Sequence, residues 1–259
     1  MHEVTVATFN VHAGIDGFGR PYDLVEACRS IDADVLLLQE AFAPLTGQSQ
    51  ANEIAIELGY DSAELALSRA WRVRDPLPLA SGWQPRKPLP KAGRALRVGA
   101  RLSQSGRPVE DYAEGTWGLA ILSRTGLSSR RTIELGKLPR DPTARKVLSV
   151  TLDDGLQVFC THAAHFTHGS AFQLRKLHAV LPGASVPALL GGDMNFWGPP
   201  LQTLLPGWRR AARGRSWPAW RPLHQLDHLF VTPCVKATAG GSLRLGNSDH
   251  LPIWARLTY

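Results

Sequence analysis

The chain has 259 residues, 44% of them hydrophobic and 20% charged, which is the composition of a globular protein and not of a disordered one. No apolar run reaches the about eighteen residues of a membrane span. No secretion signal is recognisable, so we expect a cytoplasmic location. The net charge of +7 and the pI of about 9.7 favour an anionic partner.

The first half of the sequence predicts strands that alternate with helices. Residues 3–9 alternate between apolar and polar side chains, which is typical of a strand. Residues 22–31 have helical spacing, and residues 34–38 form a continuous apolar run that predicts a buried strand. A helix is expected over 50–58 and a strand over 117–122.

The second half is richer in strands. Residues 146–152 and 156–161 flank an Asp-Asp-Gly turn at 153–155 and predict a hairpin. The further elements expected are a helix at 171–181 and strands at 186–190, 226–231, 234–239 and 251–257. Hairpins mixed with strand–helix–strand units indicate layered sheets with helices outside.

One segment differs from the rest in charge. Residues 68–109 contain ten arginines and lysines against a single acidic residue, with little periodicity. We expect one domain over residues 1–259 that carries this segment as a basic insertion at about 68–112. Such a segment attracts a polyanion, and Trp71 and Trp83 within it offer faces on which bases stack. The alternative is a solvated surface insertion.

Polar side chains gather at the ends of the expected strands, in distant parts of the sequence. They are Asn10, Glu40, His162, Asp193 with Asn195, and Asp249 with His250. Each motif alone is also common in ordinary turns and surface positions. Together they are what an active site needs, because a rigid sheet carries such residues while its loops present them.

The types of these residues indicate a particular chemistry. The oxygen ligands of Asn10, Glu40 and Asp249 suit a hard cation, Mg²⁺ or Mn²⁺, better than zinc. Histidines such as His162 and His250 suit proton transfer at neutral pH. A metal, a base and an acid together fit the hydrolysis of a phosphate ester.

The order of the motifs resembles the endonuclease/exonuclease/phosphatase superfamily, which includes deoxyribonucleases, abasic-site endonucleases, sphingomyelinases and inositol-polyphosphate phosphatases. The resemblance spans essentially the whole chain and is carried by Asn10, Glu40, residues 118–124, Thr161 with His162, residues 192–195, Asp227 and residues 248–250. It implies an α/β fold, namely a four-layer α/β sandwich of two facing mixed β-sheets flanked by helices.

The resemblance also implies a role for each residue. Glu40 would be the principal metal ligand, with Asn10 beside it and Asp249 close by. The catalytic roles would fall to His250 as base or electrostatic partner of the phosphate, Asp227 as its orienting group, Asp193 as the group that positions or activates water, Asn195 as a phosphate contact, and His162 as the acid.

Three further residues are expected to bind substrate on weaker grounds, namely His12, Arg124 and Arg145. His12 also marks a departure, because abasic-site endonucleases usually carry an acidic residue at that position. This difference argues against a dedicated abasic-site enzyme.

We therefore expect a hydrolase, an Mg²⁺- or Mn²⁺-dependent phosphodiesterase and specifically a nuclease that acts on DNA or RNA. The basic segment at 68–109 and a second loop rich in tryptophan and arginine, residues 206–224, favour nucleic acid, since arginines can follow its backbone while tryptophans stack on bases. The tryptophans of the second loop are Trp208, Trp217 and Trp220. The alternatives are a phospholipid (sphingomyelinase-like) phosphodiesterase whose tryptophans and arginines lie on an anionic membrane, an inositol-phosphate phosphatase, or a binding module without catalysis. No obligate protein partner is inferred.

Overall fold

A computed structural model describes residues 2–17, 20–73, 112–139, 141–166, 169–198, 200–245 and 248–259. In chain order its elements are β1 (Glu3–Asn10), η1 (His12–Gly14), α1 (Leu24–Ile31), β2 (Val35–Pro44), α2 (Gln50–Leu58), β3 (Asp61–Val73), β4 (Tyr112–Ser123), β5 (Leu127–Gly136), β6 (Arg145–Leu152), β7 (Gln157–His162), α5 (Ser170–His178), β8 (Ala188–Asp193), α6 (Leu201–Leu204), β9 (Arg209–Arg210), β10 (Asp227–Val231), β11 (Lys236–Ser242) and β12 (Ile253–Thr258).

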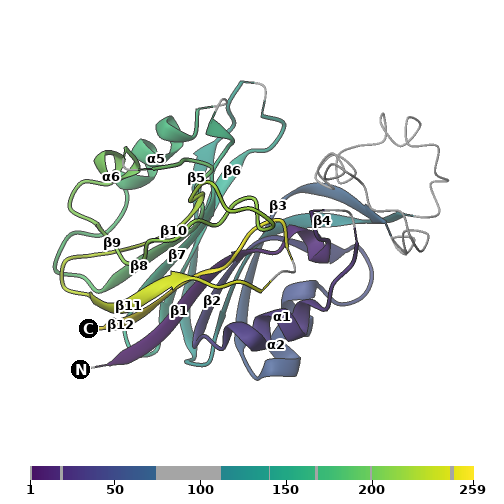
Figure 1. Cartoon of the computed structure of the whole chain (residues 1–259), viewed down its shortest axis with the longest axis horizontal. Coiled ribbons are helices and arrows are strands. Elements are labelled where there is room, and N and C mark those ends of the chain that lie inside the picture. The colour runs from purple at the N-terminus through teal and green to yellow at the C-terminus, as the bar shows by residue number, and fades with distance from the viewer. Residues whose placement is uncertain are drawn as a thin grey trace.

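The strands form two six-stranded mixed sheets that face each other (Figure 1). One sheet has the order β11-β12-β1-β2-β4-β3 and the other the order β5-β6-β7-β8-β10-β9. Helices α1 and α2 cover the outer face of the first sheet, while α5 and α6 cover the outer face of the second (Figure 1). The expected α/β sandwich, with two facing sheets flanked by helices, is confirmed.

Three apolar cores hold these layers together, and the sequence of strand β2 shows how two of them are specified. Val35 and Leu37 point into the core between the sheets, whereas Leu36 and Leu38 point into the core beneath α1 and α2. A strand with apolar side chains on both faces has to be buried on both sides. The continuous apolar run therefore places β2 in the middle of the sandwich.

The strand register brings the polar strand ends to one edge of the molecule. β1 runs parallel to β2 and β7 runs parallel to β8, so each pair ends at the same edge. Within the second sheet, His162 pairs with Asp193, and Asp193 pairs with Asp227 at the start of the antiparallel strand β10. Three of the expected site residues thus lie side by side in one row.

Gly192 allows this row to form. It has a φ of 144°, a conformation that suits glycine and few other residues. A Cβ atom at this position would collide with the backbone carbonyl of Thr161 on the neighbouring strand. The close approach of β7 and β8, immediately before His162 and Asp193, therefore requires glycine.

Three strands were missed by the sequence patterns, the long strands β3 and β5 and the two-residue strand β9. β3 (Asp61–Val73) and β5 (Leu127–Gly136) lie at the edges of their sheets, and most residues of β5 are exposed. Edge strands bury few side chains, so they show little apolar alternation. The expected strand at 34–38 also continues to Pro44, and the segment 206–224 contains the short strand β9 (Arg209–Arg210).

The basic insertion is described only at its two ends, where residues 68–73 belong to β3 and residue 112 begins β4. The prediction that this segment attracts a polyanion falls on residues 74–111 for the most part, which lie outside the described residues. Among the helices of the described part of the chain, none is both long and apolar enough to cross a membrane.

We expect Gly192→Ala to lower the free energy of unfolding by roughly 3 kcal/mol, because the added methyl group forces β7 and β8 apart and the backbone out of its φ. Urea-induced unfolding measures this change. Gly183→Ala is the control, since a Cβ there meets no atom within 4 Å. Equal stability of the two variants would show that the strands separate at no cost.

Candidate active site

Side chains from both sheets meet at the edge where the parallel strands end. Asn10 is the last residue of β1, and His162 and Asp193 are the last residues of β7 and β8. The Asn10 Nδ2 atom donates a hydrogen bond to Asp193 Oδ2 at 3.1 Å, with both residues buried. This bond joins the two sheets directly, so the two sets of strand ends form one site.

Glu40 enters the site through a β-bulge. The register of β2 against β4 shifts between Gln39 and Ala41, and Glu40 between them has a φ of 58°. An extra residue in one strand turns its side chain away from the regular alternation. The carboxylate accepts a hydrogen bond from Asn10 Nδ2 at 3.3 Å and lies 3.9 Å from His162 Nε2. The strained backbone thus directs Glu40 to the strand ends.

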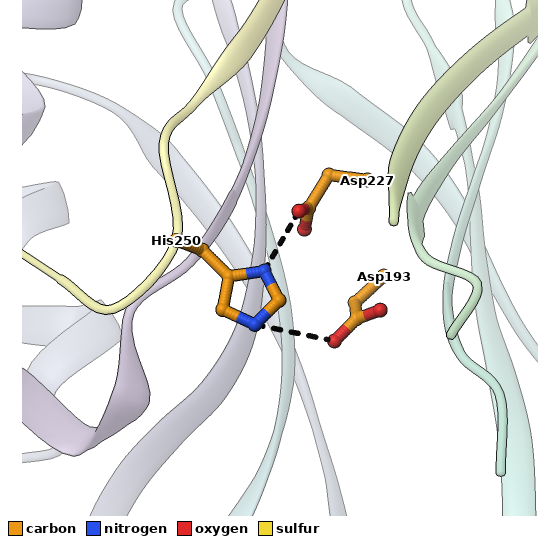
Figure 2. A group of neighbouring side chains, drawn as sticks. All are labelled: Asp193, Asp227 and His250. Carbon is orange, nitrogen blue, oxygen red and sulfur yellow. Dashed lines mark hydrogen bonds and ion pairs between the residues drawn. The ribbon is translucent and has the colours of Figure 1, made fainter. Parts of the chain in front are cut away.

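His250 lies between two carboxylates. Its Nδ1 atom donates to Asp227 Oδ2 at 2.7 Å, and its Nε2 atom lies 3.9 Å from Asp193 Oδ2. Figure 2 shows the ring reaching from the segment before β12 toward the two aspartates of the facing sheet. All three residues are at least 97% buried.

The carboxylates control the protonation of this ring. Burial alone lowers the pKa of His250, since it disfavours the charged form. The negative charges of Asp227, Asp249 and Asp193, with the hydrogen bond to Asp227, overcome this effect and raise the pKa to about 10. His250 is therefore a buried imidazolium at neutral pH.

Asn195 and Asp193 are held by the turn that follows β8. The Asn195 backbone N–H donates to Asp193 Oδ1 at 2.8 Å, and its Nδ2 atom donates to the carbonyl of Ala163 at 3.1 Å. Asn195 has a φ of 47°, a conformation that asparagine tolerates better than most residues. The turn fixes both side chains against the end of β7.

His162 faces the same two acids as Asn10. Its Nε2 atom lies 3.5 Å from Asp193 Oδ2 and 3.9 Å from Glu40 Oε1. The ring of Trp117, from β4, contacts the imidazole with an edge-to-face geometry at 5.4 Å between centroids. The packing of Trp117 restricts the orientation of the imidazole.

Ser248 connects the last motif to the first. Its Oγ atom donates to the Asn10 carbonyl at 2.7 Å and accepts from the His250 backbone N–H at 3.2 Å. Asp249 lies 3.6 Å from His12 Nδ1, which is also 2.8 Å from the Ile15 carbonyl. The structure therefore brings His12 and Asp249 to the site as a buried pair beside Asn10.

Two expected substrate contacts are placed differently. Arg145 is 4% exposed, and its Nε atom donates to Asp141 Oδ2 at 2.9 Å while Nη1 donates to the His162 carbonyl at 3.2 Å. It supports His162 from behind. Arg124 lies beyond the other end of β2 and pairs with Asp32 at 2.7 Å on the surface. The structure does not bring Arg124 to the site.

The donor set suits a hard divalent cation. Glu40 and Asp249 offer carboxylate oxygens, and the Glu40 side chain remains 19% exposed. Asp193, Asp227 and His250 also offer atoms within 4.8 Å of one another. There, however, each ring nitrogen of His250 already faces a carboxylate, with Nδ1 2.7 Å from Asp227 and Nε2 3.9 Å from Asp193. The surroundings of Glu40 fit the ion better.

The sequence patterns missed several residues that shape the site. Asp141 stands four positions before Arg145. This spacing indicates an ion pair when both residues lie on a helix, but Asp141 lies in a loop, so the sequence did not point to the pair. Trp117 directly precedes the glycine of a family motif, and only the fold shows that it packs on His162.

Comparison with known proteins gives a consistent family assignment. Residues 7–250 match the model of the Endonuclease/Exonuclease/phosphatase family. No curated protein gives a significant match to the sequence.

Solved structures share the fold at low identity. An endonuclease/exonuclease/phosphatase from Beutenbergia cavernae is 20% identical with a TM-score of 0.67, over 99% of this chain and 72% of that one. The mannosyl-6-phosphatase Bt3783 of Bacteroides thetaiotaomicron is 16% identical with a TM-score of 0.61, over 99% and 100%. D. rerio TDP2, complexed with a single-strand DNA product, is 14% identical with a TM-score of 0.56, over 100% of each chain.

We expect Arg145→Met to lower the free energy of unfolding by about 3–5 kcal/mol, because it leaves the buried Asp141 carboxylate without its partner. Arg124→Met is the matched control and should change it by less than about 1 kcal/mol, since its ion pairs are exposed to solvent. Thermal or urea unfolding of both variants measures the difference. An Arg145→Met protein as stable as wild type would contradict the structural role of the Arg145–Asp141 ion pair.

Proposed function

Because the chain belongs to the Endonuclease/Exonuclease/phosphatase family, we propose that it is a divalent-metal-dependent phosphodiesterase that cleaves nucleic acid. The family name joins nucleases with phosphatases, and both hydrolyse phosphate esters. The observation that carries the proposal is the meeting of Asn10, Glu40, His162, Asp193 and His250 at one edge of two sheets. Buried ionisable groups that gather in one place are typical of a functional site.

His250 is the electrostatic partner of the attacked phosphate. A pKa raised to about 10 keeps the imidazole protonated, so it cannot act as the base at neutral pH. Its Nε2–H faces the space next to Asp193, where a phosphate oxygen would accept a hydrogen bond. Asp227 fixes the ring by accepting from Nδ1 at 2.7 Å.

Asp193 is the base that orients and deprotonates the attacking water. Its Oδ2 atom lies near three side-chain nitrogens, Nδ2 of Asn10, Nε2 of His162 and Nε2 of His250. His162 is the acid that protonates the leaving oxygen. The second hydrogen of Asn195 Nδ2, beyond the one given to Ala163, binds a phosphate oxygen.

Glu40, Asn10 and Asp249 would hold the cation, which we propose is Mg²⁺ or Mn²⁺ because the ligands are oxygen atoms. When bound, the ion neutralises the charge of the phosphate. Glu40 is suited to this role by the bulge that projects its carboxylate toward Asn10.

Nucleic acid is the preferred substrate because of charge. The chain has a net charge of +7, and a polyanion gains affinity from each arginine or lysine near its phosphates. A neighbour of the same fold was solved with a DNA product, which supports this choice, although another is a sugar phosphatase. Phospholipid and inositol phosphates remain the alternative substrates. The single domain over residues 1–259 and the cytoplasmic location also stay predictions.

The substrate is tested with the purified protein against plasmid DNA, RNA, sphingomyelin and inositol phosphates in parallel. We expect cleavage of a nucleic acid with Mg²⁺ or Mn²⁺ and loss of cleavage with EDTA. Hydrolysis of the lipid or the inositol phosphates alone would replace the nuclease assignment by the alternative. Inactivity on all four substrates would contradict the proposed enzyme.

The role of Glu40 is tested by Glu40→Gln, which keeps the shape of the side chain and removes its charge. We expect Mn²⁺ affinity in isothermal titration to fall by roughly 100-fold and activity to fall with it. Glu57→Gln is the matched control, because Glu57 is exposed on α2. Unchanged Mn²⁺ affinity in Glu40→Gln would exclude Glu40 as a ligand.

A further inference from the structure

Three loops that carry site residues also carry exposed aromatic rings. Phe166 follows the end of β7 and is 44% exposed, and Trp197, two residues after Asn195, is 51% exposed. His224, exposed as well, lies three residues before Asp227. We name Phe166, Trp197 and His224 the aromatic row.

The rings of the aromatic row are neighbours in space. The centroids of Phe166 and Trp197 lie 6.3 Å apart, and those of Trp197 and His224 lie 6.2 Å apart. Their planes are inclined by 50° and 39°, so the rings are not stacked face to face on each other. Ring faces that are not used within the row remain available to a ligand.

The row rests on a rigid base. Phe196 is 8% exposed and contacts Phe166 edge to face at 5.1 Å. Its backbone carbonyl is 3.0 Å from Nε2 of the buried His228. The His224 backbone pairs with Trp217 in a short bridge. Such supports reduce the entropy that the rings lose when a ligand binds.

From this arrangement we propose that the aromatic row is a stacking platform for an unpaired nucleobase next to the cleaved phosphate. The inference rests on the proposed function and narrows its substrate to single-stranded or locally unpaired nucleic acid. Base–aromatic stacking needs a free base face, which a duplex does not offer. Trp197 stands two residues from Asn195, so the Cα atoms of the two residues are at most about 7 Å apart.

Half-exposure of the rings favours a base over a lipid. Phe166 and Trp197 are 44% and 51% exposed, so about half of each side chain is covered by the protein. An interfacial membrane anchor buries a broad apolar face rich in Trp, Phe and Leu, whereas a stacking platform needs only the faces of a few rings. The sequence had suggested Trp208 as a stacking residue, but Trp208 is 4% exposed in the core.

The test measures binding without turnover. A fluorescently labelled single-stranded oligonucleotide is titrated with protein in EDTA, and its anisotropy gives Kd. We expect Trp197→Ala and Phe166→Ala each to raise Kd roughly tenfold, the scale of one stacked base, and Trp197→Phe to restore most of the affinity. Phe172→Ala, at a 65% exposed phenylalanine on α5, should bind as wild type does.

A second oligonucleotide, which keeps the sugar–phosphate backbone but lacks the bases, shows whether Trp197 contacts a base or the backbone. The Trp197→Ala and wild-type proteins should bind this strand equally. An equal loss on both strands, or unchanged binding of the normal strand, would overturn the platform. Binding of anionic vesicles that Trp197→Ala abolishes, with DNA affinity unchanged, would overturn it in favour of a membrane.

These outcomes are separate from those of the proposed function. A wild-type protein that binds the oligonucleotide through Trp197 but hydrolyses no nucleic acid with Mg²⁺ or Mn²⁺ would refute the nuclease and leave the platform standing. A protein that cleaves DNA while Trp197→Ala leaves Kd unchanged would refute the platform alone.

Discussion

Asp193 and Asp227 are paired residues of adjacent strands, and both side chains are at least 98% buried. Two buried carboxylates so close together need a positive charge against them, because desolvation and mutual repulsion both oppose ionisation. His250 supplies that charge from the segment before β12, with its pKa raised to about 10. The contact between His250 and Asp227 thereby also links the two sheets at this edge.

The rest of the site is built around this charge. Asn10 directs its Nδ2 donor toward Asp193, and His162 directs its Nε2 atom there. Gly192, the residue before Asp193, lets β7 and β8 approach closely. Glu40 and Asn195 have positive φ angles, so backbone strain is concentrated where the side chains have to point inward. A rigid sandwich can bear such strain because its three apolar cores stabilise the strands on both sides.

The sequence predicted the polar strand ends of the site well. It did not predict the β-bulge, the edge strands β3, β5 and β9 or the burial of the arginines. Asn10, His162 and Asp193 were found because a buried strand has a plain apolar pattern, and a polar residue marks its end. The bulge at Glu40 depends on pairing with β4, and the edge strand β5 buries too little to leave a pattern. Both Arg145 and Arg124 were expected to bind substrate, but Arg145 is buried and Arg124 lies on the surface. The sequence does not distinguish them, because tertiary packing decides which arginine is buried.

The charge state of His250 is the most direct test. Nitrogen-15 NMR of the imidazole, assigned with His250→Gln and recorded in EDTA across pH, reports the protonation of both ring nitrogens. The structure predicts an imidazolium whose titration midpoint lies near 10, and a lower midpoint in Asp227→Asn because one of the raising charges is lost. A neutral ring that titrates near the ordinary value of 6.5 would contradict the paired-carboxylate site.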